Sequence, residues 1–138
     1  MEITTRKLLM PVDVSQLAEM RNQVDQICIQ NGLSTVATRR MVLAIDEALS
    51  NIIEHGHMDE GETIELTLDI SLDEITVMLR DSGIAFDPCS SQRQPQQESY
   101  PRRGFGLYLI RLIVDELQYK RSDDGFNVLS LIKRLDQQ

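Results

Sequence analysis

Two glycines placed directly before an apolar segment constrain this chain more than any other feature. Gly104 and Gly106 stand in the sequence RRGFGLYLI, which runs from Arg102 to Ile110. Glycine lets the backbone bend and approach a ligand where a Cβ would collide. The unpaired N–H groups at the start of the following helix then point toward an anion. The spacing is weak evidence alone, but it predicts a phosphate-binding loop that leads into a helix.

A polar stripe interrupts an apolar helix upstream of this loop. Glu47, Asn51 and His55 follow one another four residues apart in MVLAIDEALSNIIEHG, so they share one helical face. An acid and an amide on a buried face cost free energy unless they are hydrated or bound to a ligand. Carboxylate and amide oxygens one turn apart suit a hydrated magnesium ion that carries phosphates. The alternative interpretation is an ordinary solvated helix face.

A third polar group follows a strand in the middle of the chain. The sequence DSGIAFDP begins at Asp81, just after the alternating residues Ile75 to Leu79. A carboxylate at a strand end accepts a hydrogen bond from an exocyclic amine, and Gly83 beside it leaves room for a flat ring. This pattern describes an adenine pocket. An ordinary turn is the alternative, since Asp, Ser, Gly and Pro all favour turns.

Composition limits the class of protein. The chain has 138 residues, of which 41% are hydrophobic, and these values suit one domain spanning residues 1–138. Cys28 and Cys89 match no metal-ligand spacing and are expected to be free thiols of a cytoplasmic protein. No apolar run approaches membrane-spanning length. A net charge of −8 argues against non-specific nucleic-acid binding and favours a protein partner.

Periodicity and turn residues predict the secondary structure. One helix is expected from its cap at Asp13 to Asn31, and a longer one from its cap at Ser34 to His55. The stretch from Cys89 to Arg103 has no pattern and is typical of a lid or a disordered loop. The expected strands comprise residues 2–10, 63–70, 75–79, 119–121 and 126–135.

A third helix is expected from Phe105 to about Leu117, with Leu109, Leu112 and Ile113 on one side. These elements together predict a two-layer α/β sandwich. It would contain a mixed, mostly antiparallel sheet of about five strands with three helices on one face. The first strand or the first helix is expected to contribute a homodimer contact.

The order of these blocks resembles the GHKL ATPases, a superfamily that includes gyrase, heat-shock chaperones and histidine kinases. An acid and an amide on a helix come first, then two strands and D-x-G, then a lid and G-x-G-L opening a helix. The short form with AIDEALSNIIEHG, DSGIAFDP and GFGLYLIRLIVDE is similar to the anti-sigma-factor serine kinases. The resemblance covers nearly the whole chain and implies the histidine-kinase-like fold.

The resemblance also implies roles for individual residues. Glu47 would be the general base that takes the proton from an attacking hydroxyl, and Asn51 would ligate Mg²⁺. Asp81 would hold the adenine amine of ATP. Gly83 would line the base pocket.

The phosphate loop receives its roles from the same resemblance. Gly104 and Gly106 would wrap the phosphates, with Leu107 beside them. Arg102 and Arg103 would add positive charge, or else be solvated side chains of the lid. Some family members carry another glycine where this chain has Arg103, and the last hairpin, GFNVLSL, lacks the paired threonines of some relatives. Both departures bear on the affinity for ATP.

The function implied is an anti-sigma factor. Such a protein binds an alternative sigma factor and uses ATP to phosphorylate a serine on an anti-sigma-factor antagonist, a STAS-type domain. The alternative is an adaptor that sequesters a protein partner without transferring phosphate. The catalytic fragment of a two-component histidine kinase fits less well, because no helix with an acceptor histidine precedes the domain.

Arg21 is the candidate residue for partner binding. It is the only basic residue between Pro11 and Leu33, and it borders the apolar stripe of the first helix. Arginine is enriched at protein interfaces, and the resemblance makes this helix a docking face for the sigma factor or the antagonist. The alternative is a solvent-exposed pair with Glu19 or Asp25, which would contribute little.

Overall fold

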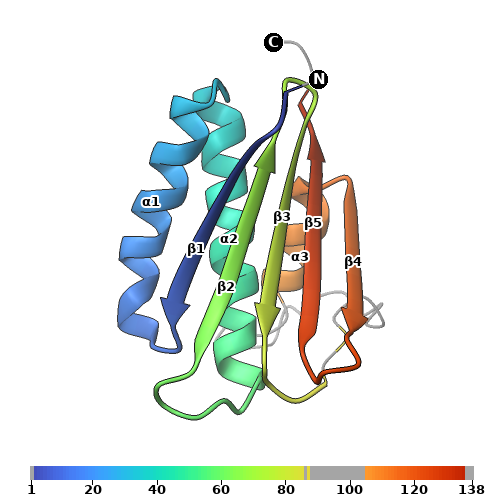
Figure 1. The fold of residues 1–138 in the computed structure, drawn as a ribbon. Coiled ribbons are helices and arrows are strands. Elements are labelled where there is room, and N and C mark those ends of the chain that lie inside the picture. The colour runs from blue at the N-terminus through green and yellow to red at the C-terminus, as the bar shows by residue number, and fades with distance from the viewer. Residues whose placement is uncertain (1, 86, 88–104, 136–138) are drawn as a thin grey trace.

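The described residues form a five-stranded sheet with three helices on one face. The structure is a computed structural model that describes residues 2–85, 87 and 105–135. The strands follow the spatial order β1-β2-β3-β5-β4, and every neighbouring pair is antiparallel. Figure 1 shows α1, α2 and α3 on the same side of this sheet. The predicted two-layer α/β sandwich is therefore confirmed. The strands are β1 (Thr4–Pro11), β2 (Thr63–Ile70), β3 (Glu74–Asp81), β4 (Glu116–Arg121) and β5 (Asn127–Arg134).

The caps predicted for the first two long helices are present. Asp13 accepts a hydrogen bond from the backbone N–H of Ser15 (2.9 Å) and opens a short 3-10 helix, η1 (Val14–Gln16), that continues into α1 (Leu17–Gln30). Ser34 Oγ accepts from the N–H of Ala37 (3.1 Å) and caps α2 (Thr35–His55). These side-chain acceptors satisfy N–H groups that have no partner within the helix.

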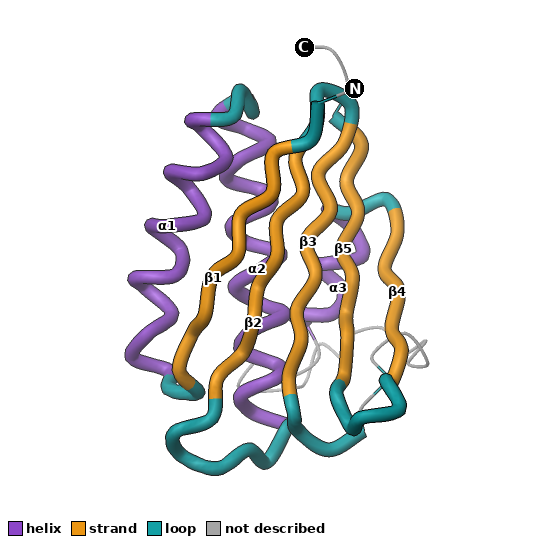
Figure 2. The backbone as a smooth tube through the Cα atoms, viewed as in Figure 1, coloured by secondary structure: helices purple, strands orange, loops and turns teal. Residues whose placement is uncertain are grey.

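The core fills the space between the sheet and the helices. In β2 and β3 every second residue is buried, and the buried residues of the two strands pair directly, as in Leu66 with Leu79 and Leu68 with Val77. Period-two alternation places these side chains on one face of the sheet. The opposite face carries half-buried polar side chains, such as Thr67. Figure 2 shows that the loops gather at the two ends of the strands.

The third helix is shorter than the sequence predicted. It comprises Phe105–Ile113, and the chain then enters β4, where Leu117 pairs with Leu131 instead of extending the helix. The segment after Ile113 pairs with β5 and leaves the helix. The N–H of Asp115 donates to the carbonyl of Ile132 (2.8 Å), and the β4–β5 ladder begins there. The expected apolar side of the helix was also wrong at one position. Leu112 is 65% exposed, whereas Ile110 is buried.

Cys28 lies in the core with a free thiol. Burial raises its pKa to about 12, with a smaller contribution from the negative charge of Asp25. The thiol therefore stays protonated and behaves as a small apolar side chain. No helix in the described part of the chain is both long and apolar enough to cross a membrane.

Two leucines test the position of the core. Leu66 is fully buried in β2, and Leu72 in the β2–β3 turn is 90% exposed. We expect Leu66→Ala to lower the free energy of unfolding by about 2–5 kcal/mol, because it removes packing and leaves a cavity. Leu72→Ala should change it by less than about 0.5 kcal/mol. Urea unfolding followed by circular dichroism measures both, and equal losses would contradict this arrangement of the core.

Candidate functional site

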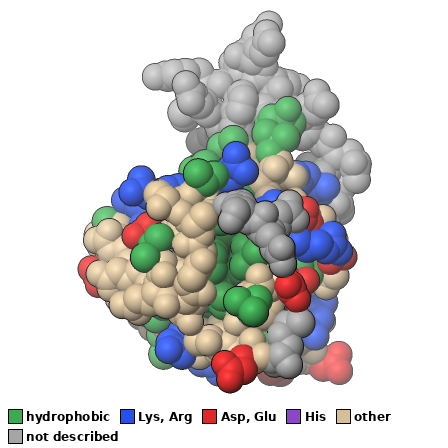
Figure 3. All heavy atoms as spheres, turned by 90° about the horizontal axis from the view of Figure 1, so that it is seen from above, with side chains coloured by type: hydrophobic (Ala, Val, Ile, Leu, Met, Phe, Trp, Pro, Cys, Tyr) green, Lys and Arg blue, Asp and Glu red, His purple; other side chains and the backbone are tan. Residues whose placement is uncertain are grey.

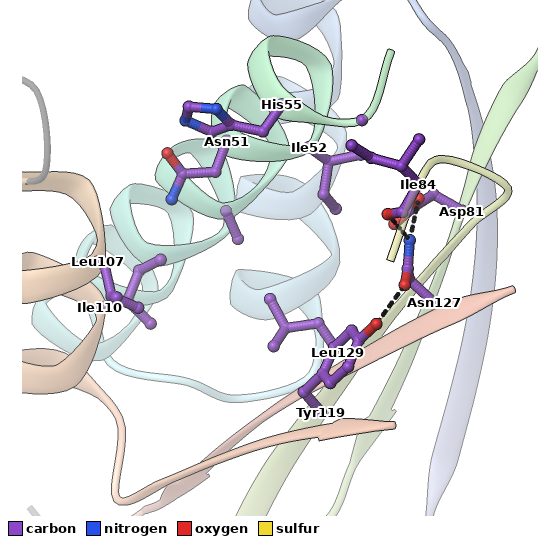
Figure 4. Close-up of a pocket in the computed structure, with 12 residues that line it drawn as sticks. Asn51, Ile52, His55, Asp81, Ile84, Leu107, Ile110, Tyr119, Asn127 and Leu129 are labelled. Atoms are coloured by element: carbon purple, nitrogen blue, oxygen red, sulfur yellow. Dashed lines mark hydrogen bonds between the residues drawn. The ribbon is translucent and has the colours of Figure 1, made fainter. Parts of the chain in front are cut away.

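A cavity lies where the end of α2, the end of β3 and the start of β5 meet. Figure 4 shows Asn51, Ile52 and His55 of α2 on one side and Asp81, Asn127 and Leu129 of the sheet on the other. Leu107 and Ile110 of α3 supply further apolar wall. An apolar cavity with a few polar groups is the usual form of a small-molecule site. The residues that line it are Ala48, Asn51, Ile52, His55, Gly56, Asp81, Ile84, Leu107, Ile110, Tyr119, Asn127 and Leu129.

Asp81 provides a buried carboxylate at this cavity. It is 4% exposed, and its Oδ1 accepts hydrogen bonds from the N–H of Gly83 (2.9 Å) and from Nδ2 of Asn127 (3.0 Å). Its Oδ2 accepts no hydrogen bond from the described residues. A carboxylate held in this way presents one acceptor oxygen to a ligand that carries an N–H group. This is the arrangement that an adenine amine needs.

Gly83 has a packing role that the sequence did not reveal. A Cβ built on Gly83 would lie 2.7 Å from the carbonyl oxygen and 2.9 Å from the Cα of Gly56, at the end of α2. The N–H of Ile84 donates to the same carbonyl (3.0 Å). Glycine is therefore required because two backbones meet here. Gly83 thereby joins the end of β3 to the end of α2, and Ile84, which follows it, lines the cavity. The role of Gly83 in a base pocket stays a prediction.

Only part of the polar stripe of α2 lines the cavity. Asn51 and His55 line the cavity, and Glu47 lies one turn earlier. The side-chain amide of Asn51 is half-buried and makes no hydrogen bond to any described residue, so its oxygen is available to a ligand. His55 lies 3.8 Å from Glu54 through its Nε2 atom. Asn51 and His55 of the stripe therefore form part of the cavity wall.

Glu47 packs against the first turn of α3. A Cβ built on Gly106 would lie 2.6 Å from its Oε2 atom, so a side chain at this position would force the carboxyl group of Glu47 to move. Partial burial raises the pKa of Glu47, and the negative charge of neighbouring Asp46 raises it further. Both causes disfavour the charged form. A carboxylate with a raised pKa is a better proton acceptor than an ordinary glutamate, which is the property required of a general base.

Only part of the predicted phosphate loop can be placed. Arg102, Arg103 and Gly104, together with the lid expected at 89–103, lie outside the described residues. Leu107 of α3 lines the cavity, and Gly106 of α3 lies beside Glu47 of α2. The start of α3 is thus close to both the cavity and the candidate base.

Sequence reasoning missed three residues around Asp81. Asn127 is buried at the start of β5, and it contacts Tyr119 and Arg121 of β4 as well as Asp81. One signal was present in the sequence. Alternation places Asn127 on the same face as Leu129 and Leu131, and an amide on a buried face needs partners.

Arg21 pairs with a residue that was not expected. Its guanidinium donates to Asp46 Oδ1 of α2 (2.9 Å), whereas the alternative interpretation of the sequence had paired it with Glu19 or Asp25. Asp25 faces Arg39 instead, at 3.7 Å. The two helices run side by side, so partners on α2 lie nearer than those along α1. Arg21 therefore ties α1 to the residue that precedes Glu47.

A second hollow lies at the opposite end of the molecule. Figure 3 views that end and shows charged side chains of both signs around it. Arg40, Leu72, Lys133 and Arg134 are among its lining residues. Lys133 pairs with Asp115 and Arg134 with Glu116, so part of its positive charge is already neutralised. No group of three or more His, Cys, Asp and Glu side chains among the described residues is arranged to hold a metal ion.

The family of this protein is shown by a match that spans almost the whole fold. The model of the histidine kinase-like ATPase domain matches residues 10–133, from the end of β1 to the end of β5. The chain belongs to this family. Within the histidine kinase-like ATPase family, it is similar to the serine-protein kinase RsbW of Bacillus cereus (strain ZK / E33L). The two are 26% identical over 130 residues, which cover 89% of this chain and 81% of that protein.

Solved structures share the fold. The RsbU and RsbW domains of a Mycobacterium tuberculosis protein superpose with a TM-score of 0.69 at 16% identity, covering 98% of this chain. This chain spans only 33% of that longer one. SiaB in the SiaB–SiaC complex from Pseudomonas aeruginosa gives a TM-score of 0.63 at 14% identity, covering 94% of this chain and 89% of that one. At these identities the likeness concerns the fold alone.

The effect of the Asp46 charge on the pKa of Glu47 can be measured. We expect Asp46→Asn to lower the pKa of the Glu47 carboxyl, because a neighbouring negative charge favours the protonated form. NMR titration of the side-chain carboxyl carbon measures this pKa directly. Asp69→Asn, on the opposite face of the sheet, is the matched control and should leave it unchanged. A Glu47 pKa that does not respond to Asp46→Asn would contradict the cause assigned here.

Proposed function

We propose that this protein is an ATP-dependent serine-protein kinase that acts as an anti-sigma factor. The observation that carries the proposal is the placement of Glu47, a half-buried carboxyl with a raised pKa, one turn before Asn51, which lines the cavity together with Asp81. A base, a magnesium ligand and an adenine acceptor in this order are what phosphoryl transfer to a hydroxyl requires. The similarity to the serine-protein kinase RsbW supports the same activity.

ATP and Mg²⁺ fit the chemistry of the cavity. Asp81 Oδ2 would accept the adenine amine, and apolar side chains such as Ile52 and Leu129 would contact the flat ring. Asn51 would ligate Mg²⁺ through its amide oxygen, which has no partner among the described residues. One protein ligand is enough for a magnesium ion that keeps its waters and binds phosphates. Arg102, Arg103 and Gly104 would surround the phosphates.

Transfer would place the γ-phosphoryl group of ATP on a serine of a partner protein. The serine oxygen forms a bond to phosphorus, the bond to the bridging oxygen breaks, and ADP leaves. Glu47 takes the serine proton during the same step. The protein contributes position and a proton acceptor, which suffices for phosphoryl transfer.

The partners we propose are an alternative sigma factor and a STAS-type antagonist that carries the serine, in the cytoplasm. Arg21 is the proposed contact residue, since it remains 45% exposed while it pairs with Asp46. We also propose a homodimer. It is supported by the edge position of β1, where Leu9 and the nearby Val14 are more than half exposed, at 63% and 65%.

The variant Glu47→Gln distinguishes the phosphoryl-transfer step from the binding of ATP. The change removes the proton acceptor but keeps the size of the side chain, so phosphoryl transfer should fall by about 100-fold or more while ATP still binds. Labelled ATP and candidate antagonist domains provide the assay, with calorimetry for binding. Glu65→Gln, on the far face of the sheet, is the control and should retain full activity. Transfer at the wild-type rate in Glu47→Gln would rule out this base, and wild-type protein that binds ATP but labels no partner would favour an adaptor.

Arg21→Ala tests the partner surface against a matched ion pair. Arg21 and Arg39 each connect α1 to α2, through Asp46 and Asp25. We expect Arg21→Ala to weaken binding of the sigma factor or antagonist by about tenfold, as for an interface arginine. Arg39→Ala should leave that affinity unchanged, and both variants should bind ATP normally. Calorimetry measures these affinities, and equal effects of the two variants would place the docking surface elsewhere.

A further inference from the structure

Asn127 is the centre of a buried hydrogen-bond network in the wall of the cavity. It is 5% exposed, and its Nδ2 donates to Asp81 Oδ1 (3.0 Å), to the carbonyl of Ile84 (2.8 Å) and to the carbonyl of Gly83 (3.2 Å). Its Oδ1 accepts from Tyr119 Oη (2.5 Å) and Arg121 Nη1 (3.1 Å). Both donor hydrogens and both acceptor sites of the amide are therefore used.

The surroundings fix the orientation of this amide. Three acceptor atoms, on Asp81, Gly83 and Ile84, face its nitrogen, and two donors, on Tyr119 and Arg121, face its oxygen. A rotation by 180° would place its oxygen against three acceptors and its nitrogen against a guanidinium. Such a buried arrangement would leave several polar groups unsatisfied, so only one orientation is stable. Figure 4 shows Asn127 held between Asp81 and Tyr119.

This orientation determines what Asp81 presents to a ligand. Asn127 and the N–H of Gly83 both donate to Asp81 Oδ1, which limits the rotation of the carboxyl group. Arg121 also donates to the carbonyl of Gly83 (2.8 Å) and holds the turn that follows Asp81. The remaining oxygen, Oδ2, is thereby kept as a hydrogen-bond acceptor toward the cavity.

We propose that Asn127, oriented by Tyr119 and Arg121, is the positioning residue that makes this site select a 6-aminopurine over a 6-oxopurine. The inference rests on the proposed ATP site and concerns how the base is chosen there. A 6-amino group donates to Asp81 Oδ2, whereas a 6-oxo group places an acceptor against an acceptor. Without Asn127, the carboxyl group of Asp81 can rotate, and its free oxygen is no longer held where it accepts a hydrogen bond from a 6-amino group. The preference for the amine then weakens.

The test compares the affinities of Mg-ATP and Mg-ITP, whose bases differ at position 6, for the wild type and Asn127→Ala. Calorimetric titration should show that the wild type prefers ATP. In Asn127→Ala the ratio of the two affinities should fall by about tenfold, mainly through weaker binding of ATP. A purely structural role would weaken both nucleotides equally and leave the ratio unchanged, and that result would overturn the inference.

Tyr119→Phe keeps the test decisive if Asn127→Ala does not fold. It retains the ring that lines the cavity and removes only the hydroxyl that donates to Asn127, so a smaller fall in the same ratio is expected. An unchanged ratio in Tyr119→Phe would then overturn the inference. Ser130→Ala, on the opposite face of β5, is the control and should keep the wild-type ratio. Failure of the wild type to bind either nucleotide would instead refute the proposed function.

Discussion

The close contact between Gly56 and Gly83 holds the two halves of the candidate site together. It joins the end of α2, which carries Asn51, to the turn after β3, which follows Asp81. Neither glycine tolerates a side chain. A Cβ on Gly83 would collide with Gly56, and one on Gly56 would lie 2.6 Å from the carbonyl oxygen of Ile52. Because backbone meets backbone here, the fold sets the position of the end of α2, which carries Asn51, relative to the end of β3, which carries Asp81.

A second glycine contact sets the environment of the candidate base. Gly106 lets the carboxyl of Glu47 lie against α3, where burial and the charge of Asp46 raise its pKa. Arg21 pairs with Asp46, so its positive charge offsets part of the negative charge that Glu47 senses. Asp46 therefore contacts Arg21, the candidate partner residue, and precedes Glu47, the candidate base, in the sequence.

Local patterns predicted much of this fold because they report on local physics. Alternation in β2 and β3 and the cap at Ser34 arise from neighbouring residues, and both are confirmed. The end of α3 was wrong because the residues up to Leu117 also fit helical spacing, and only pairing with β5 decides between helix and strand. Contacts between distant residues had no local signal, among them the pair of Arg21 with Asp46 and the bonds of Asn127. Gly83 was recognised as special, but its reason, the packing on Gly56, depends on the tertiary fold.

Thermal unfolding with and without Mg-ATP tests the central claim that the cavity beside Asp81 binds nucleotide. A ligand that binds only the folded state raises Tm by mass action, so millimolar Mg-ATP should raise the Tm of the wild type by about 5 °C or more. Asp81→Asn replaces the acceptor oxygen pair by an amide and should lose most of this gain. A wild-type Tm that millimolar Mg-ATP leaves unmoved would contradict the account.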